Sequence, residues 1–138
     1  MSKIYVLDAC ALIAVLSNEP GASKVVDVYK EVLAGTAELV MNAVNLLEVY
    51  YDDRRAHGEV AANKMLSSVK ALSIRIVSDI DEALFCEAGR LKASYKISLA
   101  DAFALAQTKV VDGTLLTADH HEFDAVEASE PIRFLWIR

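Results

Sequence analysis

Short apolar runs alternate along this chain with longer segments in which apolar residues recur at helical spacing. Five runs are predicted as β-strands, namely residues 3–8, 37–41, 74–78, 114–117 and 132–137. Helices are predicted between them over about 10–17, 20–34, 43–56, 59–72, 79–95 and 98–111. Strands that alternate with helices are typical of an α/β fold, here a parallel sheet of four or five strands flanked by helices.

Polar residues mark the ends of several of these elements. Asn42 and Asp79 are expected to cap the helices that follow them, and Ser98 opens a capping-box pattern with Asp101 three residues later. Residues 120–126 are expected to form a loop or a short helix. The chain has no internal repeat, low-complexity segment or domain boundary, so residues 1–138 are predicted to form one domain.

The composition is that of a globular protein. At 138 residues and 54% hydrophobic content, the chain is long enough and apolar enough for a substantial core. Its two cysteines, Cys10 and Cys86, define no disulfide framework, and the first residues lack the apolar run of a signal peptide. No segment reaches the roughly 20 apolar residues that a membrane span needs. We therefore expect a cytoplasmic protein without a membrane segment.

Two acids directly follow predicted strands. Asp8 ends the first strand, and Asp119 comes two residues after the fourth. In open α/β sheets, ligands bind outside the carboxyl ends of the strands. If the two strands are neighbours, these acids face one crevice.

Two further acids lie within apolar helical segments. Glu48 is surrounded by apolar and aromatic residues, and a buried carboxylate is costly unless a cation or hydrogen bonds compensate it. An acid near a helix start, stabilised by the helix dipole, is an equally good explanation of Glu48. Asp101 is explained by the capping box alone. Glu48 and Asp101 are interpreted as functional because this topology would place them together with Asp8 and Asp119.

Such a cluster suits a hard cation. Carboxylates without His or Cys partners favour Mg²⁺ or Mn²⁺ over Zn²⁺. A bound ion acidifies water and neutralises charge on a phosphoryl oxygen, which is the chemistry of phosphodiester hydrolysis. The net charge of −6 argues mildly against a nucleic-acid substrate. Without the four acids the charge of −6 becomes −2, so net charge does not exclude one.

Four segments carry a resemblance to a known family. They are Leu7–Ala14 (Leu-Asp-Ala-Cys-Ala-Leu-Ile-Ala), Asn45–Val49, Ser98–Ala106 and Leu115–Asp119. In this order and at this chain length they resemble the PIN domain, and within it the VapC-type toxins of bacterial and archaeal toxin–antitoxin pairs. The resemblance implies a Mg²⁺- or Mn²⁺-dependent endoribonuclease, a homodimer, and a cognate antitoxin protein that blocks the site.

The resemblance also assigns residues. The four catalytic, metal-binding acids would be Asp8, Glu48, Asp101 and Asp119, and the supporting residues would be Cys10, Asn45, Ser98 and Thr117. Two positions depart from the family pattern. Cys10 replaces the usual Ser or Thr, and a thiol is a weaker hydrogen bonder than a hydroxyl. Ala118 stands where the family often has Gly.

Other polar residues have simpler interpretations. His120 and His121 are expected to be loop residues near the mouth of the site. Several cations are candidates for RNA phosphate contacts or, more simply, for solvated helix faces: Arg54, Arg55, Arg90, Lys92 and Lys96.

The sequence leaves alternative functions open. A housekeeping PIN nuclease of RNA processing would share the acids but need no antitoxin. A non-catalytic PIN-like binding domain is a further alternative because Cys10 departs from the family pattern. Other classes lack their signatures. A phosphoacceptor domain wants paired acids after the first strand, an Asp-nucleophile phosphatase wants Asp at position 10, and a dinucleotide-binding enzyme wants a Gly-rich turn there.

Overall fold

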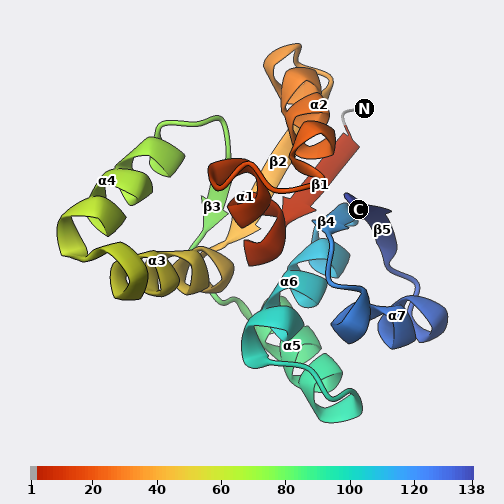
Figure 1. Ribbon diagram of the computed structural model, residues 1–138. Coiled ribbons are helices and arrows are strands. Elements are labelled where there is room, and N and C mark those ends of the chain that lie inside the picture. Colours follow the sequence, from red (N-terminus) through yellow and green to blue (C-terminus); the bar gives the residue numbers. More distant parts are fainter. Residues whose placement is uncertain (1–2) are drawn as a thin grey trace.

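Five parallel strands form a single sheet in the computed structural model, which describes residues 3–138 (Figure 1). The strands are β1 (Lys3–Leu7), β2 (Ala37–Asn42), β3 (Arg75–Val77), β4 (Thr114–Thr117) and β5 (Arg133–Trp136). Their order across the sheet is β3-β2-β1-β4-β5. The predicted α/β class and parallel sheet are confirmed, and β1 lies between β2 and β4 at the centre.

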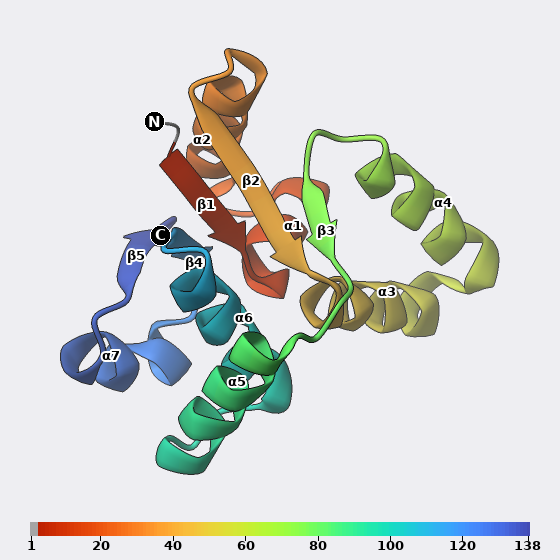
Figure 2. The same ribbon diagram turned by 180° about the vertical axis from the view of Figure 1, so that it is seen from behind.

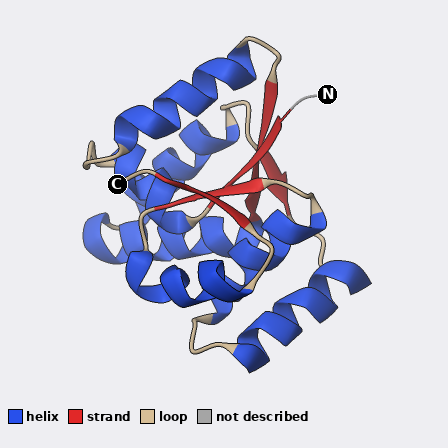
Figure 3. Ribbon diagram, turned by 90° about the vertical axis from the view of Figure 1, so that its right-hand side faces the viewer, coloured by secondary structure: helices blue, strands red, loops and turns tan. Residues whose placement is uncertain are grey.

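Seven helices in the described part of the chain cover the two faces of this sheet (Figures 2 and 3). They are α1 (Ala9–Leu16), α2 (Ala22–Leu33), α3 (Ala43–His57), α4 (Glu59–Lys70), α5 (Glu82–Ser94), α6 (Leu99–Val110) and α7 (His120–Ser129). Buried residues of α1 to α4 join one hydrophobic core, and those of α5 to α7 join another on the opposite face. The fold is therefore a three-layer α/β/α sandwich.

The two cores follow from the alternation of side chains along the central strand. Tyr5 and Leu7 of β1 point into the core beneath α1 to α4, whereas Val6 between them points into the core beneath α5 to α7. All three side chains are at most 9% exposed. A central parallel strand buried on both faces is expected to be a continuous apolar run, as β1 is from Ile4 to Leu7.

Two predictions about individual elements were wrong. Asp81, rather than Asp79, caps α5, because its side chain accepts a hydrogen bond from the Leu84 N–H at 2.9 Å. His120 and His121 are the first residues of a helix, α7, rather than loop residues, so the helix alternative for the segment after Asp119 is the one that the structure shows, over ten residues. Phe123 and Val126 anchor this helix, since both are fully buried in the second core.

A search of residues 3–138 for membrane spans finds no helix with the length and apolarity that crossing a bilayer requires.

Candidate active site

Asp8 lies at the carboxyl end of the central strand and also begins a helix. It is the N-cap of α1, and its Oδ1 accepts a hydrogen bond from the Ala11 N–H at 2.8 Å. The Asp8 N–H reaches the Leu116 carbonyl of β4 at 3.5 Å, which ties this residue to the neighbouring strand. Only 4% of Asp8 is exposed. This is a buried carboxylate that secondary structure holds in one direction.

Asp119 follows the adjacent strand at the same edge of the sheet. Because β1 pairs with β4, with Leu7 opposite Leu116, the predicted neighbourhood of the first and fourth strands is confirmed. The Asp119 N–H donates to Thr117 Oγ1 at 3.1 Å, and Asp119 Oδ1 accepts from the Glu122 N–H at 3.2 Å as the N-cap of α7. Both strand-end acids are thus oriented by the helix that each begins.

Glu48 and Asp101 reach the same region from two helices that pack against each other. Asn45, one turn before Glu48 in α3, donates from Nδ2 to the Ala100 carbonyl at the start of α6 across 2.9 Å. Ser98 caps α6 as predicted, and its Oγ accepts from the Asp101 N–H at 3.1 Å. Asp101 therefore takes part in the helix cap and also lies near the other acids.

The four carboxylates act on one another through their charges. Burial is the largest cause of a rise in the pKa of Asp8 to about 7; hydrogen bonds with Thr117 and Ala11 lower it, while Asp101 and Asp119 raise it further. The pKa of Asp101 is raised chiefly by burial and also by Asp119. Burial raises the pKa of Glu48 too, followed by the charges of Asp101, Asp52 and Asp119.

Within the described part of the chain, no cationic side chain pairs with these acids. Among residues 3–138, no Lys, Arg or His nitrogen lies within 4.0 Å of a carboxylate oxygen of Asp8, Glu48, Asp101 or Asp119. Burial and the charge of Asp8 raise the pKa of the half-buried Cys10 thiol, which favours its neutral form, and Arg138 acts in the opposite direction. Crowded carboxylates without a cationic partner are a site prepared for a cation.

The donor chemistry of the site fits a hard metal ion. In the part of the chain that the structure describes, no three His, Cys, Asp or Glu side chains are close enough together to ligate one ion as they stand. The set nevertheless offers oxygen ligands and uncompensated negative charge. It also includes an orphaned acceptor, because Asn45 is 1% exposed and its Oδ1 has no hydrogen-bond partner among the described residues. Unpaired buried oxygens of this kind suit Mg²⁺ or Mn²⁺ and their water shells.

Thr117 links the two strand-end acids. This fully buried residue hydrogen-bonds with Asp8 and also accepts from the Asp119 N–H. The sequence suggested it as a supporting residue, but the double contact depends on strand pairing. The Asn45–Ala100 bond is likewise visible only in the structure, since it joins residues 55 positions apart.

Three of the candidate RNA-binding cations are engaged in ion pairs within the chain. Arg90 binds Glu87 and Glu130 through Nη2, the second across 2.6 Å. Arg54 and Arg55 pair with Glu59 and Asp52 at 3.6 and 3.7 Å. These three side chains therefore form ion pairs within the protein, on helix surfaces and between helices.

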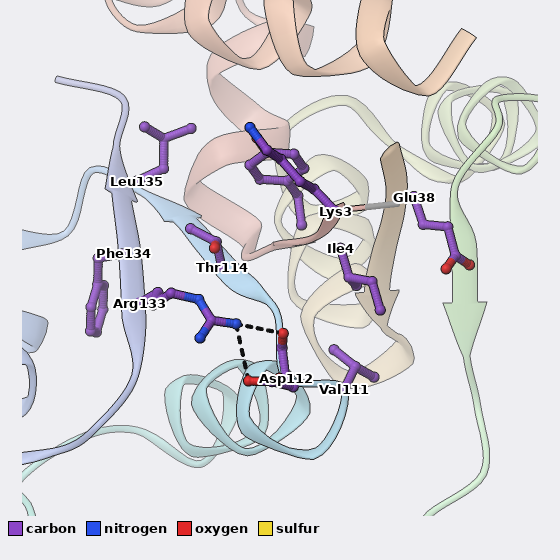
Figure 4. Close-up of a pocket in the computed structure, with 10 residues that line it drawn as sticks. Lys3, Ile4, Glu38, Val111, Asp112, Thr114, Arg133, Phe134 and Leu135 are labelled. Carbon is purple, nitrogen blue, oxygen red and sulfur yellow. Dashed lines mark hydrogen bonds and ion pairs between the residues drawn. The ribbon is translucent and has the colours of Figure 1, made fainter. Parts of the chain in front are cut away.

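A large hollow of about 870 Å³ lies at the opposite edge of the sheet (Figure 4). It is lined by residues from the beginnings of β1, β2, β4 and β5, and contains none of the four acids. Within it, Arg133 Nη2 donates to the carbonyl and to Oδ1 of Asp112 at 2.6 and 3.0 Å. This hollow is separate from the acid-bearing edge because parallel strands place all their carboxyl ends on the other side.

Comparison with known proteins places this arrangement in a class. Residues 5–128 match the PIN domain family, so the chain belongs to the PIN domain family. No curated protein matches the chain.

Solved structures share the fold at low sequence identity. A chain of a toxin–antitoxin complex from Klebsiella pneumoniae is 20% identical, with a TM-score of 0.69 over 97% of this chain and 98% of that one. VapBC-1 from nontypeable Haemophilus influenzae is 15% identical, with a TM-score of 0.72 over the same shares. DNA-bound VapBC from Salmonella typhimurium is 14% identical, with a TM-score of 0.74 over 100% of both chains.

Proposed function

We propose that this protein, as one PIN domain over residues 1–138, is a Mg²⁺- or Mn²⁺-dependent endoribonuclease and the toxin of a toxin–antitoxin pair. One observation carries the nuclease proposal. Asp8 and Asp119 follow β1 and β4, Glu48 and Asp101 lie in α3 and α6, and the charges of Asp101 and Asp119 raise the pKa of Asp8 and of Glu48. Among residues 3–138, no cationic side chain pairs with these four acids. We assign the catalytic, metal-binding role to Asp8, Glu48, Asp101 and Asp119.

The chain's own residues hold the acids in place for this chemistry. When bound, the metal would supply an acidified water and neutralise charge on the phosphoryl oxygen. The Ala11 N–H and Thr117 orient Asp8, and Ser98 orients Asp101. Hydrogen bonds therefore hold Asp8 and Asp101 in place before any ion binds, which lowers the cost of assembling the site.

An antitoxin partner is supported by the similar toxin–antitoxin structures and by one apolar surface. A hollow between α1, α2 and the sheet is lined by apolar side chains and Tyr29, including the partly exposed Val15, Val26 and Leu72. Exposed apolar patches of this kind mark protein-binding sites. Expression of the chain alone should arrest bacterial growth. Co-expression of a small neighbouring reading frame with a DNA-binding motif should restore it, whereas a housekeeping nuclease would need no such partner.

A homodimer is the second assembly that we propose. Large apolar side chains remain exposed on three helices of the acid-bearing region, with Leu47 57%, Phe85 69% and Leu99 58% exposed. Light scattering of the purified chain should give twice the 15.1 kDa mass. A mass of one chain across micromolar concentrations would reject the dimer without affecting the nuclease assignment.

The decisive experiment is RNA cleavage with Mg²⁺ or Mn²⁺ by the wild type, Asp8→Asn and Asp101→Asn. We expect both variants to lose cutting, down to the level of a chelator control, while circular dichroism shows the fold retained. Asp52→Asn is the matched control, because the charge of Asp52 raises the pKa of Glu48 but Asp52 is not one of the four proposed catalytic acids. Undiminished cutting by both variants would reject the shared site. RNA binding without cutting in either metal would favour a non-catalytic PIN-like domain.

A further inference from the structure

His120, the first residue of α7, is stacked against an aromatic side chain of the edge strand. Its ring lies on Trp136 of β5 with centroids 3.8 Å apart and planes 14° from parallel. Trp136 in turn stacks with Phe134, at 5.2 Å and 8°. The His120 side chain is still 49% exposed, so the ring face that does not lie on Trp136 is open to solvent. We call His120 and Trp136 the stacking platform.

Hydrogen bonds on both ring nitrogens hold the platform in one orientation. His120 Nδ1 lies 2.9 Å from Asp124 Oδ1, and Nε2 lies 3.0 Å from the Arg138 carbonyl oxygen. Trp136 Nε1 donates to Glu127 Oε2 at 3.1 Å. A surface ring fixed in this way loses little conformational freedom when a flat ligand stacks on it, which favours binding.

The platform is attached to the same strand end as the acids. His120 directly follows Asp119. The Ile137 N–H, one residue beyond Trp136, donates to the Thr117 carbonyl at 3.0 Å. Thr117 is the residue that contacts both Asp8 and Asp119. A ligand on the open face of His120 therefore lies at the same end of the strands as the carboxylates.

Two cations lie at the end of the platform strand. Lys24 Nζ donates to the Trp136 carbonyl at 3.2 Å, and Arg138 Nη1 donates to the Pro20 carbonyl at 2.6 Å. The Arg138 side chain is 40% exposed, and its ion-pair partner Glu19 is 3.8 Å away. A guanidinium has five N–H donors, so Arg138 has several left for a phosphate. Aromatic rings beside cations are the combination that single-stranded nucleic acids recognise.

We propose that the open face of His120 stacks with one nucleobase of single-stranded RNA beside the bond to be cut, while Arg138 contacts a neighbouring phosphate. The inference rests on the proposed ribonuclease function and names how its substrate is positioned. His120 acts here as a positioning residue, because it holds the base and leaves the reacting phosphate to the carboxylates. Stacking is tolerant of base identity, so the platform would add affinity with little sequence preference.

The test uses short single-stranded RNAs that carry 2-aminopurine at successive positions, bound to the full chain in the presence of a chelator. Stacking quenches this fluorophore, so we expect one quenched position with the wild type and with His120→Phe. His120→Ala should lose the quenching and bind about tenfold more weakly. His120→Leu, which keeps bulk against Trp136 without an aromatic face, should behave like His120→Ala and serves if the alanine variant fails to fold.

His121 provides the matched control. It is the adjacent histidine, but its side chain is 94% exposed. His121→Ala should therefore retain both quenching and affinity. Three outcomes would each overturn the proposal. His120→Leu could quench 2-aminopurine as strongly as the wild type, or His121→Ala could lose as much quenching as His120→Ala. The third is that the wild type binds no RNA.

The phosphate contact has its own readout. Arg138→Gln should reduce the slope of log Kd against log salt concentration by about one, the value for one phosphate contact, and should leave the quenched position unchanged. Arg133→Gln, at the opposite edge of the sheet, should change neither quantity. An unchanged salt dependence in Arg138→Gln would remove Arg138 from the proposal.

Failure here is distinguishable from failure of the proposed function. RNA that is cut in Mg²⁺ or Mn²⁺ but quenched at no position would overturn the platform and leave the nuclease intact. RNA that is quenched but never cut would reject the nuclease and leave the platform as a binding site.

Discussion

Asn45 donates from Nδ2 to the carbonyl oxygen of Ala100 across 2.9 Å, and this bond joins the helices that carry Glu48 and Asp101. Because Nδ2 faces a carbonyl, the amide orientation is set and Oδ1 is directed elsewhere. Oδ1 has no partner among residues 3–138 although Asn45 is 1% exposed. A buried acceptor left unpaired costs about 1–3 kcal/mol, and native structures hold few of them. If a hydrated metal ion binds the acids, Asn45 would help to hold it by accepting a hydrogen bond at Oδ1.

This inference predicts that Asn45→Ala weakens Mn²⁺ binding, by roughly 10-fold or more as is usual for residues around metal ligands. Calorimetric titration of the purified protein measures the affinity. Asn42→Ala is the matched control, because Asn42 is also buried but fully paired: its Nδ2 donates to Gln107 Oε1 and its Oδ1 accepts from the Val44 N–H, each at 2.9 Å. It should lower stability and leave Mn²⁺ affinity unchanged. Equal affinities in the two variants would make Asn45 a packing residue only.

Replacing Asp8 by Asn should stabilise the protein when metal is absent. The folded-state pKa of about 7 lies above the ordinary value of 3.8, so the charged carboxylate disfavours folding. The stabilisation by its protonated form is present below about pH 3.8 and is lost as the pH rises through about 7. In a chelator at pH 8, Asp8→Asn should raise the free energy of unfolding by about 1–4 kcal/mol. Urea unfolding at pH 8 and pH 4 tests this; an equal gain at both values would contradict it.

The ion pair between Arg90 and Glu130 should make stability depend on pH in the opposite direction. Glu130 accepts hydrogen bonds from Arg90 at 3.2 and 2.6 Å and from the Tyr95 hydroxyl at 2.7 Å. These contacts, that of Arg90 above all, lower the pKa of Glu130 to about 2. Since this value lies below the ordinary 4.5, the stabilisation is present above about pH 4.5 and is lost as the pH falls towards 2. Arg90 is 41% exposed and screened by solvent, so Glu130→Gln should cost only about 1 kcal/mol at pH 7.

Urea unfolding at pH 7 and pH 3 measures this difference. Glu59→Gln is the control, because Glu59 is 66% exposed and its partner Arg54 is 3.6 Å away. Its substitution should change stability little at either pH. A Glu130→Gln effect no larger than that of Glu59→Gln would contradict the prediction.

Gly21 should be the least replaceable glycine near the platform. Its φ of +98° is unfavourable for other residues, and an added Cβ would lie 2.7 Å from the Ile137 carbonyl oxygen. Gly21→Ala should therefore displace the segment after Trp136 and weaken 2-aminopurine quenching. Gly35 is the matched control, with φ of +81° but no atom within 4 Å of an added Cβ. Gly35→Ala should cost about 1–2 kcal/mol without altering RNA binding, and similar quenching by both variants would contradict the prediction.

Much of the fold could be predicted because its signals are local. The apolar runs of β1 and β4 and the Ser98 cap depend on residues a few positions apart, and the structure confirms them. The misplacement of the α5 cap arose because Asp79 and Asp81 are both capable N-caps, and only packing selects between them. Likewise, the helix after Asp119 looked short because its burial depends on Phe123 reaching a core built by distant segments.

For the site, the sequence by itself determined the chemical inventory: four acids, two of them at strand ends, with Cys10 in a neighbouring position. Only the tertiary structure decided which groups meet. The pairing of β1 with β4 put Thr117 against both Asp8 and Asp119, and the packing of α3 on α6 oriented Asn45. The stacking of His120 on Trp136 is of the same kind. Side-chain periodicity reports which face of an element is buried, whereas contacts between distant segments depend on how the whole core packs.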